Sequence, residues 1–197
     1  MNFDFSENYM LENERVLLRP LTFQDKKHLL PFSIHEPELW QYSLVSGSGE
    51  ENLKRYIDLA LSKRAEKDSY PFIVFDKKTN QYAGSTRFYD IQPQHNTLQL
   101  GYTWYGKQFQ GTGLNKHCKF LLLQFAFETI GVARVEFRAD NNNQKSIAAM
   151  KSIGCTVEGV LRSNCDGLNG RRDSIVLSIL KTEWETTVKG NLKVKLM

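Results

Sequence analysis

The spacing of apolar residues predicts two long helices in this chain. In residues 50–67 apolar side chains recur every three or four positions and charged ones occupy the opposite side, the pattern of a helix with one buried face. The same spacing follows Gly111-Thr112-Gly113 and runs to residue 128, so a glycine-bearing loop is expected to open an apolar helix. The apolar positions of that helix include Leu114, Cys118, Leu121, Leu122, Phe125 and Ala126.

The segment before these helices carries a strand and a helix signal. Residues 15–19 predict a first strand that Pro20 stops. Thr22 is expected to cap a helix, with Asp25 in a variant of the capping box, and Pro31 is expected to end it. No regular spacing follows, so residues 33–48 are expected to be irregular.

Runs of aromatic and β-branched residues predict the remaining strands. They cover residues 71–75, 81–91, 97–104, 132–139, 156–162 and 173–180. A short polar turn joins the first two into a hairpin, and the glycine-rich segment 164–170 joins the last two. Asn143 as N-cap and Gly154 as C-terminal stop predict a short helix at 144–153.

The order of these elements predicts an α/β fold. The helix between 97–104 and 132–139 requires a parallel β-α-β crossover, whereas the strands joined by short loops should be antiparallel. We expect a mixed, mostly antiparallel sheet of six or seven strands with helices on both faces. Neither a repeat nor a linker is visible, so residues 1–197 are expected to form one domain, with a core at about 14–185. The tail 186–197 is expected to be loose or a short helix.

Composition narrows the functional classes. Net charge is +4, but the 26 basic and 22 acidic residues are interspersed, so no direct nucleic-acid binding is expected. The N-terminus lacks a signal-peptide pattern and no apolar run approaches the ~18 residues of a membrane span. Three cysteines without a CxxC pair favour a reduced cytoplasm, and four scattered histidines predict no metal site.

The candidate chemistry begins at Gly111 and Gly113. Glycines let a ligand approach the backbone, and the free amides at a helix start attract phosphate, so we expect a pyrophosphate here. In the alternative interpretation, glycine only permits a strand–helix turn. The absence of GxxxxGK[ST] and GxGxxG motifs argues against a nucleoside triphosphate and a dinucleotide.

A longer pattern supports a ligand. Residues 108–113 fit Q-x-x-G-x-G, and residues 143–146 fit N-x-x-S. Ile153-Gly154-Cys155 leads into EGVLR at 158–162, and GRRD follows at 170–173. Together, over about residues 16–185, these motifs resemble the GCN5-related N-acetyltransferases (GNAT), and within them the branch of the bacterial ribosomal-protein N-terminal (RimJ/RimL-type) acetyltransferases.

The resemblance implies transfer of an acetyl group from acetyl-CoA to a primary amine of a protein N-terminus or a small molecule. The amine would attack directly through a tetrahedral intermediate, with neither a covalent enzyme intermediate nor a metal. The strand at 102–104 would splay from its parallel neighbour to pair with pantetheine, and an amide there would polarise the thioester. The implied CoA-binding residues are Tyr102, Thr103, Trp104, Phe109, Gln110, Gly111, Thr112, Gly113, Leu114, Asn115, Asn143 and Ser146.

Catalytic roles are less determined. The resemblance makes Ser146 a proton donor near the sulfur, although a serine also suits the first turn of a helix. Tyr102 is a second catalytic candidate. Gln99 stands where relatives often have a glutamate base, which excludes a carboxylate base at that position and leaves the base unnamed. Cys118 and Cys155 are expected in the core rather than as nucleophiles.

The acceptor side is expected in the α-rich segment before residue 50. Glu36, Trp40 and Tyr42, beside His35 and Glu38, would bind a cationic amine, or the charged ones are ordinary solvated surface. The lysines near the glycine loop would meet CoA phosphates or form an exposed helix face; they are Lys107, Lys116 and Lys119.

Three rival functions stay open. The same fold would accept a larger acyl group, or bind CoA as a non-catalytic regulatory module. An RNA-associated factor is a third candidate, against which the dispersed charge and the lack of an aromatic platform count. A protein N-terminus, a polyamine, an amino acid and an antibiotic all present an amine, and a homodimer is an allowed assembly.

Overall fold

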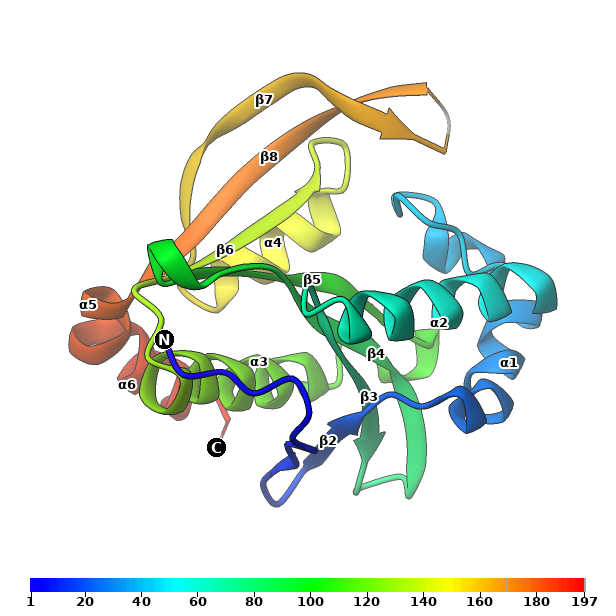
Figure 1. The fold of residues 1–197 in the computed structure, drawn as a ribbon, viewed down its shortest axis with the longest axis horizontal. Coiled ribbons are helices and arrows are strands. Elements are labelled where there is room, and N and C mark those ends of the chain that lie inside the picture. Colours follow the sequence, from blue (N-terminus) through cyan, green and yellow to red (C-terminus); the bar gives the residue numbers. More distant parts are fainter. Residues whose placement is uncertain (169, 197) are drawn as a thin grey trace.

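The computed structural model describes residues 1–168 and 170–196. Eight strands form one sheet in the order β1-β2-β3-β4-β5-β6-β8-β7 (Figure 1). Neighbours are antiparallel except β5 and β6, which are parallel, so the predicted mixed sheet with one crossover is confirmed. The strands are β1 Leu11–Glu12, β2 Val16–Pro20, β3 Tyr70–Asp76, β4 Gln81–Gln92, β5 Thr97–Tyr105, β6 Arg134–Asp140, β7 Thr156–Gly167 and β8 Gly170–Leu180. The strand beyond the expected seven is β1, whose two residues are too few to show a pattern.

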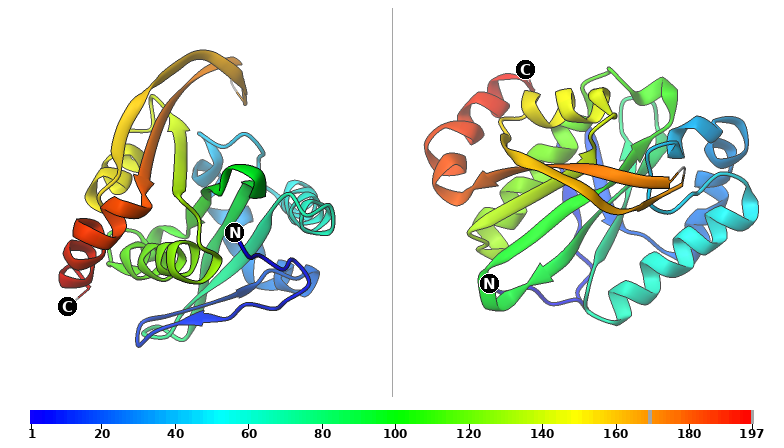
Figure 2. Two further views of the ribbon diagram at one scale, coloured as in Figure 1. Left: turned by 60° about the vertical axis from the view of Figure 1, so that its left-hand side comes forward. Right: turned by 90° about the horizontal axis from the view of Figure 1, so that it is seen from above.

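Helices cover both faces of the sheet, as expected (Figures 1 and 2). One face carries α1 and α2, whose apolar side chains cluster with Ile73 and Trp104. The other face carries α3, α4 and the C-terminal helices, which share the larger cluster. The helices are α1 Lys26–His35, α2 Glu50–Ala65, α3 Leu114–Gln124, α4 Gln144–Ser152, α5 Lys181–Glu183 and α6 Lys189–Val194.

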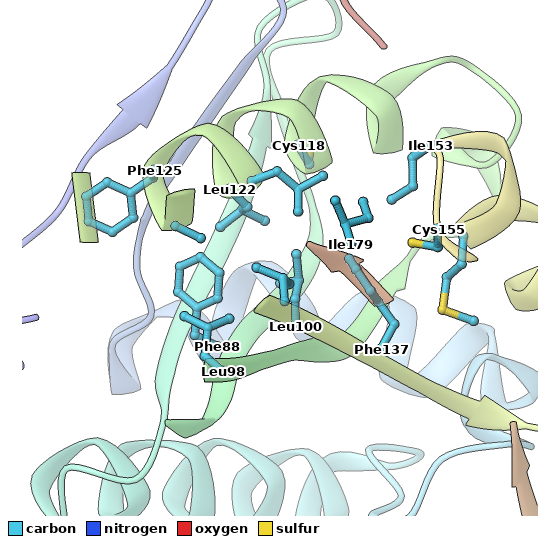
Figure 3. Close-up of a cluster of buried hydrophobic side chains, with 14 of the residues drawn as sticks. Phe88, Leu98, Leu100, Cys118, Leu122, Phe125, Phe137, Ile153, Cys155 and Ile179 are labelled. Carbon is cyan, nitrogen blue, oxygen red and sulfur yellow. The ribbon is translucent and has the colours of Figure 1, made fainter. Parts of the chain in front are cut away.

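Side chains of β5 contribute to the core on both faces of the sheet. Leu98 and Leu100 point toward α3, where they meet Cys118 and Leu122 (Figure 3). Trp104 points to the opposite face and belongs to the α1–α2 cluster. Successive strand residues face opposite sides of a sheet, so strict alternation would put residues 98, 100 and 104 on one face. The irregularity in the β4–β5 register between Ser85 and Arg87 shifts this alternation, so Trp104 faces the other side.

The prediction that Pro31 ends its helix was wrong. Helix α1 continues through Pro31 to His35. The proline lies on the exposed side of the helix, where water can satisfy the carbonyl that loses its partner. The next turn is held by Ser33, whose hydroxyl donates to the carbonyls of Gly47 and Gly49 at 2.6 and 2.9 Å. The segment expected to be irregular therefore begins with helix and contains a 3₁₀ turn, Pro37–Trp40.

The last two strands are longer than predicted. They extend through most of the expected loop 164–170, whose Asn169 lies outside the described residues. Arg171 of β8 donates to Asp166 of β7 at 3.0 Å, a cross-strand pair that stabilises the extension.

The tail is not loose as far as Val194. Helical residues run from Lys181 to Val194, with a π-helical stretch, Trp184–Val188, between α5 and α6. Trp184 is 0% exposed and Leu192 is 1% exposed, so this segment is part of the core.

Candidate functional site

The parallel strands β5 and β6 separate halfway along β5. Their pairing covers only Thr97–Gln99 against Arg134–Glu136. Beyond Gln99, the edge of β5 that faces β6 has no partner strand, whereas its other edge stays paired with β4 as far as Tyr105. A bulge interrupts the β4–β5 register here, and Tyr102 takes a positive φ of 48°. The gap exposes backbone groups that can pair with an extended ligand.

The glycine-bearing loop lies at the end of this gap. Gly111 and Gly113 have φ values of +76° and +88°, and a Cβ on either would meet no atom within 4 Å. Within the described parts of the chain, no backbone acceptor is bonded to the amides of Gly111, Thr112, Gly113 and Asn115. Gly113 is also the N-cap of α3. Open space, unpaired amides and a helix start together form a cradle suited to a phosphate group.

Side chains tie this loop to its neighbours. The side-chain amide of Gln110 donates from Nε2 to the Tyr105 carbonyl at 2.7 Å, and its Oε1 accepts from Lys145 Nζ of α4. Tyr105 donates to Asn115 Oδ1 at 3.3 Å, and the buried surroundings raise the pKa of Tyr105 well above its usual value. Phe109 and Leu114 are 2% and 0% exposed, so a ligand would contact their backbone rather than their side chains.

Helix α4 begins beside the loop as predicted. Asn143 is its N-cap, and Asn143 Oδ1 accepts from the Ser146 amide at 3.0 Å. In the described residues the Ser146 hydroxyl has no recorded hydrogen-bond partner, and the residue is only partly buried. The structure therefore brings the Q-x-x-G-x-G and N-x-x-S motifs together through the contact between Lys145 and Gln110.

Lys119 is neither on an exposed helix face nor free for phosphate. It is 5% exposed, and its Nζ donates to Thr103 Oγ1 at 2.9 Å. The same nitrogen lies 5.7 Å from the ring centroid of Phe137, so the amine spans the gap between β5 and β6 on the α3 side. Burial lowers the pKa of Lys119 to about 8. Its spacing of three residues before the buried Leu122 was the signal for a core position.

The expected acceptor residues are mostly engaged. The Glu36 carboxylate accepts from the Lys107 amide at 2.8 Å, and Glu38 forms an ion pair with Lys107 Nζ. Trp40 is 1% exposed and packs on Trp104, with ring centroids 5.1 Å apart.

Polar side chains surround Gln99, where the glutamate base was missing. Gln99 Nε2 donates to Asp90 Oδ2 at 2.6 Å, and Glu136 is its register partner on β6. These residues line a pocket of about 150 Å³, together with Gln92, Thr97, Leu98, Arg134 and Arg138. Carboxylates therefore lie beside position 99 although none occupies it, a proximity that depends on strand register. A larger hollow of about 480 Å³ lies along the exposed side of α2 and includes no residue of this region.

The structure also places Arg87, which no sequence motif indicated, and the two cysteines that were expected in the core. Arg87 of β4 is buried between the rings of Tyr56 and Tyr102, and its only sequence signal was a charge within a strand. Cys118 and Cys155 are 0% and 8% exposed and belong to the larger core cluster, as expected. Burial raises the pKa of both thiols to about 12, which disfavours the reactive thiolate.

Metal and membrane features are absent from the described residues. No group of three or more His, Cys, Asp or Glu side chains there is arranged to hold a metal ion. No helix in the same part of the chain has the length and apolar character to span a bilayer.

Comparison with known proteins identifies the family. The family model described as "Acetyltransferase (GNAT) domain" matches residues 15–156, most of the chain and all of the gap and loop. The chain belongs to the GNAT acetyltransferase family. It is thereby an acyltransferase enzyme by family.

Individual relatives and solved structures are similar to this chain in sequence or in fold. A Bacillus subtilis (strain 168) protein named "Putative ribosomal N-acetyltransferase YdaF" is 34% identical over 105 residues, 52% of this chain and 55% of the relative. A GCN5-related N-acetyltransferase from Brucella melitensis has the same fold at a TM-score of 0.89, with 23% identity over 98% of this chain and 88% of that one. Mycobacterium smegmatis RimJ in complex with CoA-disulfide is similar in fold at a TM-score of 0.79, with 16% identity over 95% and 93% of the two chains.

Proposed function

We propose that this GNAT enzyme transfers an acetyl group from acetyl-CoA to a primary amine. The observation that carries the proposal is the gap between β5 and β6, which leads into the open glycine cradle. Acetyl-CoA would supply the activated acyl group as a thioester. The fold likeness to RimJ, which was solved with CoA-disulfide, supports CoA as the ligand.

Two parts of the site would bind two different parts of CoA. Amides of Gly111, Thr112, Gly113 and Asn115 would bind the pyrophosphate, because they have no competing acceptor in the described chain. The free edge of β5 at Tyr102, Thr103 and Trp104 would pair with the pantetheine arm. β4 pairs with Gly101 and Trp104 on the other side of this stretch, which holds the backbone in place for a ligand.

The reaction needs proximity more than a special nucleophile. A neutral amine forms the new N–C bond, the C–S bond breaks, the amine loses a proton and the departing thiolate takes one. Ser146, whose hydroxyl is uncommitted, is the proposed donor of the latter proton. Asp90 and Glu136, beside Gln99, are the proposed carboxylates that accept the amine's proton through water.

The acceptor is proposed as a small-molecule amine or a protein N-terminus. The resemblance to a relative named for ribosomal acetylation supports the second class, and we expect the enzyme to act in the cytoplasm. A non-catalytic CoA-binding module is the rival, and it predicts CoA binding without consumption of any amine.

Charge reversal at the cradle tests the proposal. Gly111→Asp should weaken CoA binding by about 10- to 100-fold, because a carboxylate would face the pyrophosphate. Gly111→Asn imposes similar backbone strain without the charge and should lose much less. Calorimetry with CoA and acetyl-CoA, and thiol release over a panel of amines, are the measurements.

Gly131 provides the matched control. It lies at the other end of the same helical segment with a φ of +82° and open space at its Cβ position. Gly131→Asp should leave CoA affinity unchanged. If the wild-type protein bound neither CoA nor acetyl-CoA, the proposed function would be wrong; binding without thiol release would favour the regulatory module.

A further inference from the structure

Arg87 is a buried cation without a counter-charge. It is 3% exposed, and its Cζ lies 4.8 Å from the ring centroid of Tyr56 and 4.2 Å from that of Tyr102. Its Nε is fully buried and has no hydrogen-bond partner. Across residues 1–168 and 170–196, no carboxylate lies within 4.0 Å of this guanidinium.

This arrangement is costly unless something completes it. Tyrosine faces attract a cation, but they do not accept hydrogen bonds in the plane of the guanidinium. Arg87 Nε is the only one of its nitrogens that is both buried and unpaired, so its terminal nitrogens keep contact with solvent. A guanidinium held against two tyrosine rings, with its terminal nitrogens not fully buried, can bind a planar anion.

A second buried arginine lies on β8. Arg172 of β8 is 9% exposed; it donates to the Tyr42 carbonyl at 3.3 Å and to Ser174 Oγ at 3.2 Å, neither of which neutralises its charge. The ring of Tyr89 lies 5.0 Å from that of Tyr102. Burial and Tyr102 raise the pKa of Tyr89, and the charges of Arg138 and Arg172 oppose this rise.

The two arginines bracket the gap. Arg87 is on β4, which pairs with β5, and Arg172 is on β8, which pairs with β6. The β7–β8 hairpin arches over the sheet toward the segment between α1 and α2, and the Arg172–Tyr42 bond joins them (Figure 2). Strand order thus puts these two cations, neither of which has a carboxylate partner in the described part of the chain, on opposite sides of the gap.

We propose that the acceptor is an amine that also carries a carboxylate, bound by Arg87 and Arg172 with the hydroxyls of Tyr89 and Tyr102. This inference rests on the proposed acyl transfer and specifies its substrate class. The carboxylate can come from the α-carboxyl of a free amino acid or from an acidic side chain beside a protein N-terminus, and both present the same planar anion near an amine.

Matched pairs of acceptors test the inference. Amino acids are compared with their α-amides, and peptide amides beginning with Asp are compared with those beginning with Asn. For the preferred source, the carboxylate form should have a kcat/KM about 10- to 100-fold higher than its amide. Calorimetry with the N-acetylated products of the same pairs measures the preference without requiring turnover.

Arginine variants test whether Arg87 and Arg172 cause the preference for carboxylate over amide acceptors. Arg87→Met and Arg172→Met should each reduce the preference to within about 3-fold, mainly by raising KM, with CoA affinity unchanged. Arg87→Met should melt no lower than the wild type, because it removes an uncompensated buried charge. Arg55→Met, on the exposed face of α2 beside Tyr56, removes the same charge and should keep the full preference.

The outcomes separate two failures. Equal use and equal binding of carboxylate and amide forms, with intact CoA binding, would overturn the carboxylate assignment and leave acyl transfer standing. A preference that survives both Arg→Met variants would equally overturn it. Failure to bind CoA would overturn the proposed function and the substrate class with it.

Discussion

Lys119 is a lysine in the core, only 5% exposed. An ammonium group in the core loses most of its hydration, and Lys119 has one hydrogen-bond acceptor, Thr103 Oγ1, for three protons. Thr103 Oγ1 in turn lies 2.7 Å from Thr86 Oγ1, which makes a small polar island beneath the free edge of β5. We expect this island to reduce stability in the absence of a ligand.

Lys119→Met tests that cost. With a pKa of about 8 in the folded chain against 10.5 in the unfolded one, the unfolded chain binds more protons between those values. The wild type should therefore gain stability as the pH rises from 8 to 10.5. Lys119→Met should be more stable by about 1–3 kcal/mol at pH 7, and the difference should shrink toward pH 10.5. Denaturant unfolding at several pH values is the measurement.

Lys116→Met is the control for this prediction. Lys116 lies on the same helix but is partly exposed, so its replacement should change stability by less than about 0.5 kcal/mol at any of these pH values. A Lys119→Met protein that is less stable than the wild type by a constant amount across the pH range would contradict the argument.

At the scale of elements, the β4–β5 pair sets the position of the site. Gly84 of β4 has a φ of +156°, and a Cβ there would lie 2.0 Å from the Trp104 carbonyl of β5. Gly84→Ala should therefore destabilise the protein by about 3 kcal/mol or more, because the two backbones would have to separate.

Gly190→Ala is the control. A Cβ at this position in α6 meets nothing within 4 Å, so the substitution should instead stabilise the protein by about 0.5–1 kcal/mol. Thermal melting of both variants is the check, and equal melting temperatures would contradict the close approach.

Elements were predictable where the pattern is long. The periodicity of α2, the strand runs and the caps Asn143 and Gly154 give their positions within a few residues, because burial on one face dictates spacing. The prediction at Pro31 was wrong because the cost of the proline depends on solvent exposure and on the bonds from Ser33 to Gly47 and Gly49, which are distant in sequence.

The site was predictable only in its donor half. Glycines and a helix start are local signals, so the loop could be placed from the sequence. The neighbours of Gln99 are set by strand register, the contacts of Arg87 by α2 and β5, and those of Arg172 by the β7–β8 hairpin. Such contacts join residues far apart in sequence, and a single chain gives no local sign of them.

At the scale of the whole molecule, the C-terminal segment completes the core under α3. Trp184 is 0% exposed, stacks on Phe127 with centroids 5.7 Å apart, and donates from Nε1 to Glu128 Oε1 at 2.8 Å. Lys189 reaches the same carboxylate at 2.8 Å. These contacts fix the end of the helical segment whose beginning forms the glycine cradle, so the tail supports the position of the cradle without touching it.

Trp184→Ala should show that support. Loss of a buried indole costs about 3–5 kcal/mol, which for a chain of this size lowers the melting temperature on the order of 10 °C. Trp184→Phe keeps most of the packing but loses the bond to Glu128, so its melting temperature should fall by less. Val194→Ala, at a 70% exposed site, should be near neutral.

CoA affinity of the folded Trp184→Ala protein should stay within about 2-fold of the wild type, because the cradle lies at the other end of the helical segment. A melting temperature unaffected by Trp184→Ala would mean that the tail is loose in solution. A large loss of CoA affinity at temperatures where the variant is folded would mean instead that the tail acts on the cradle directly.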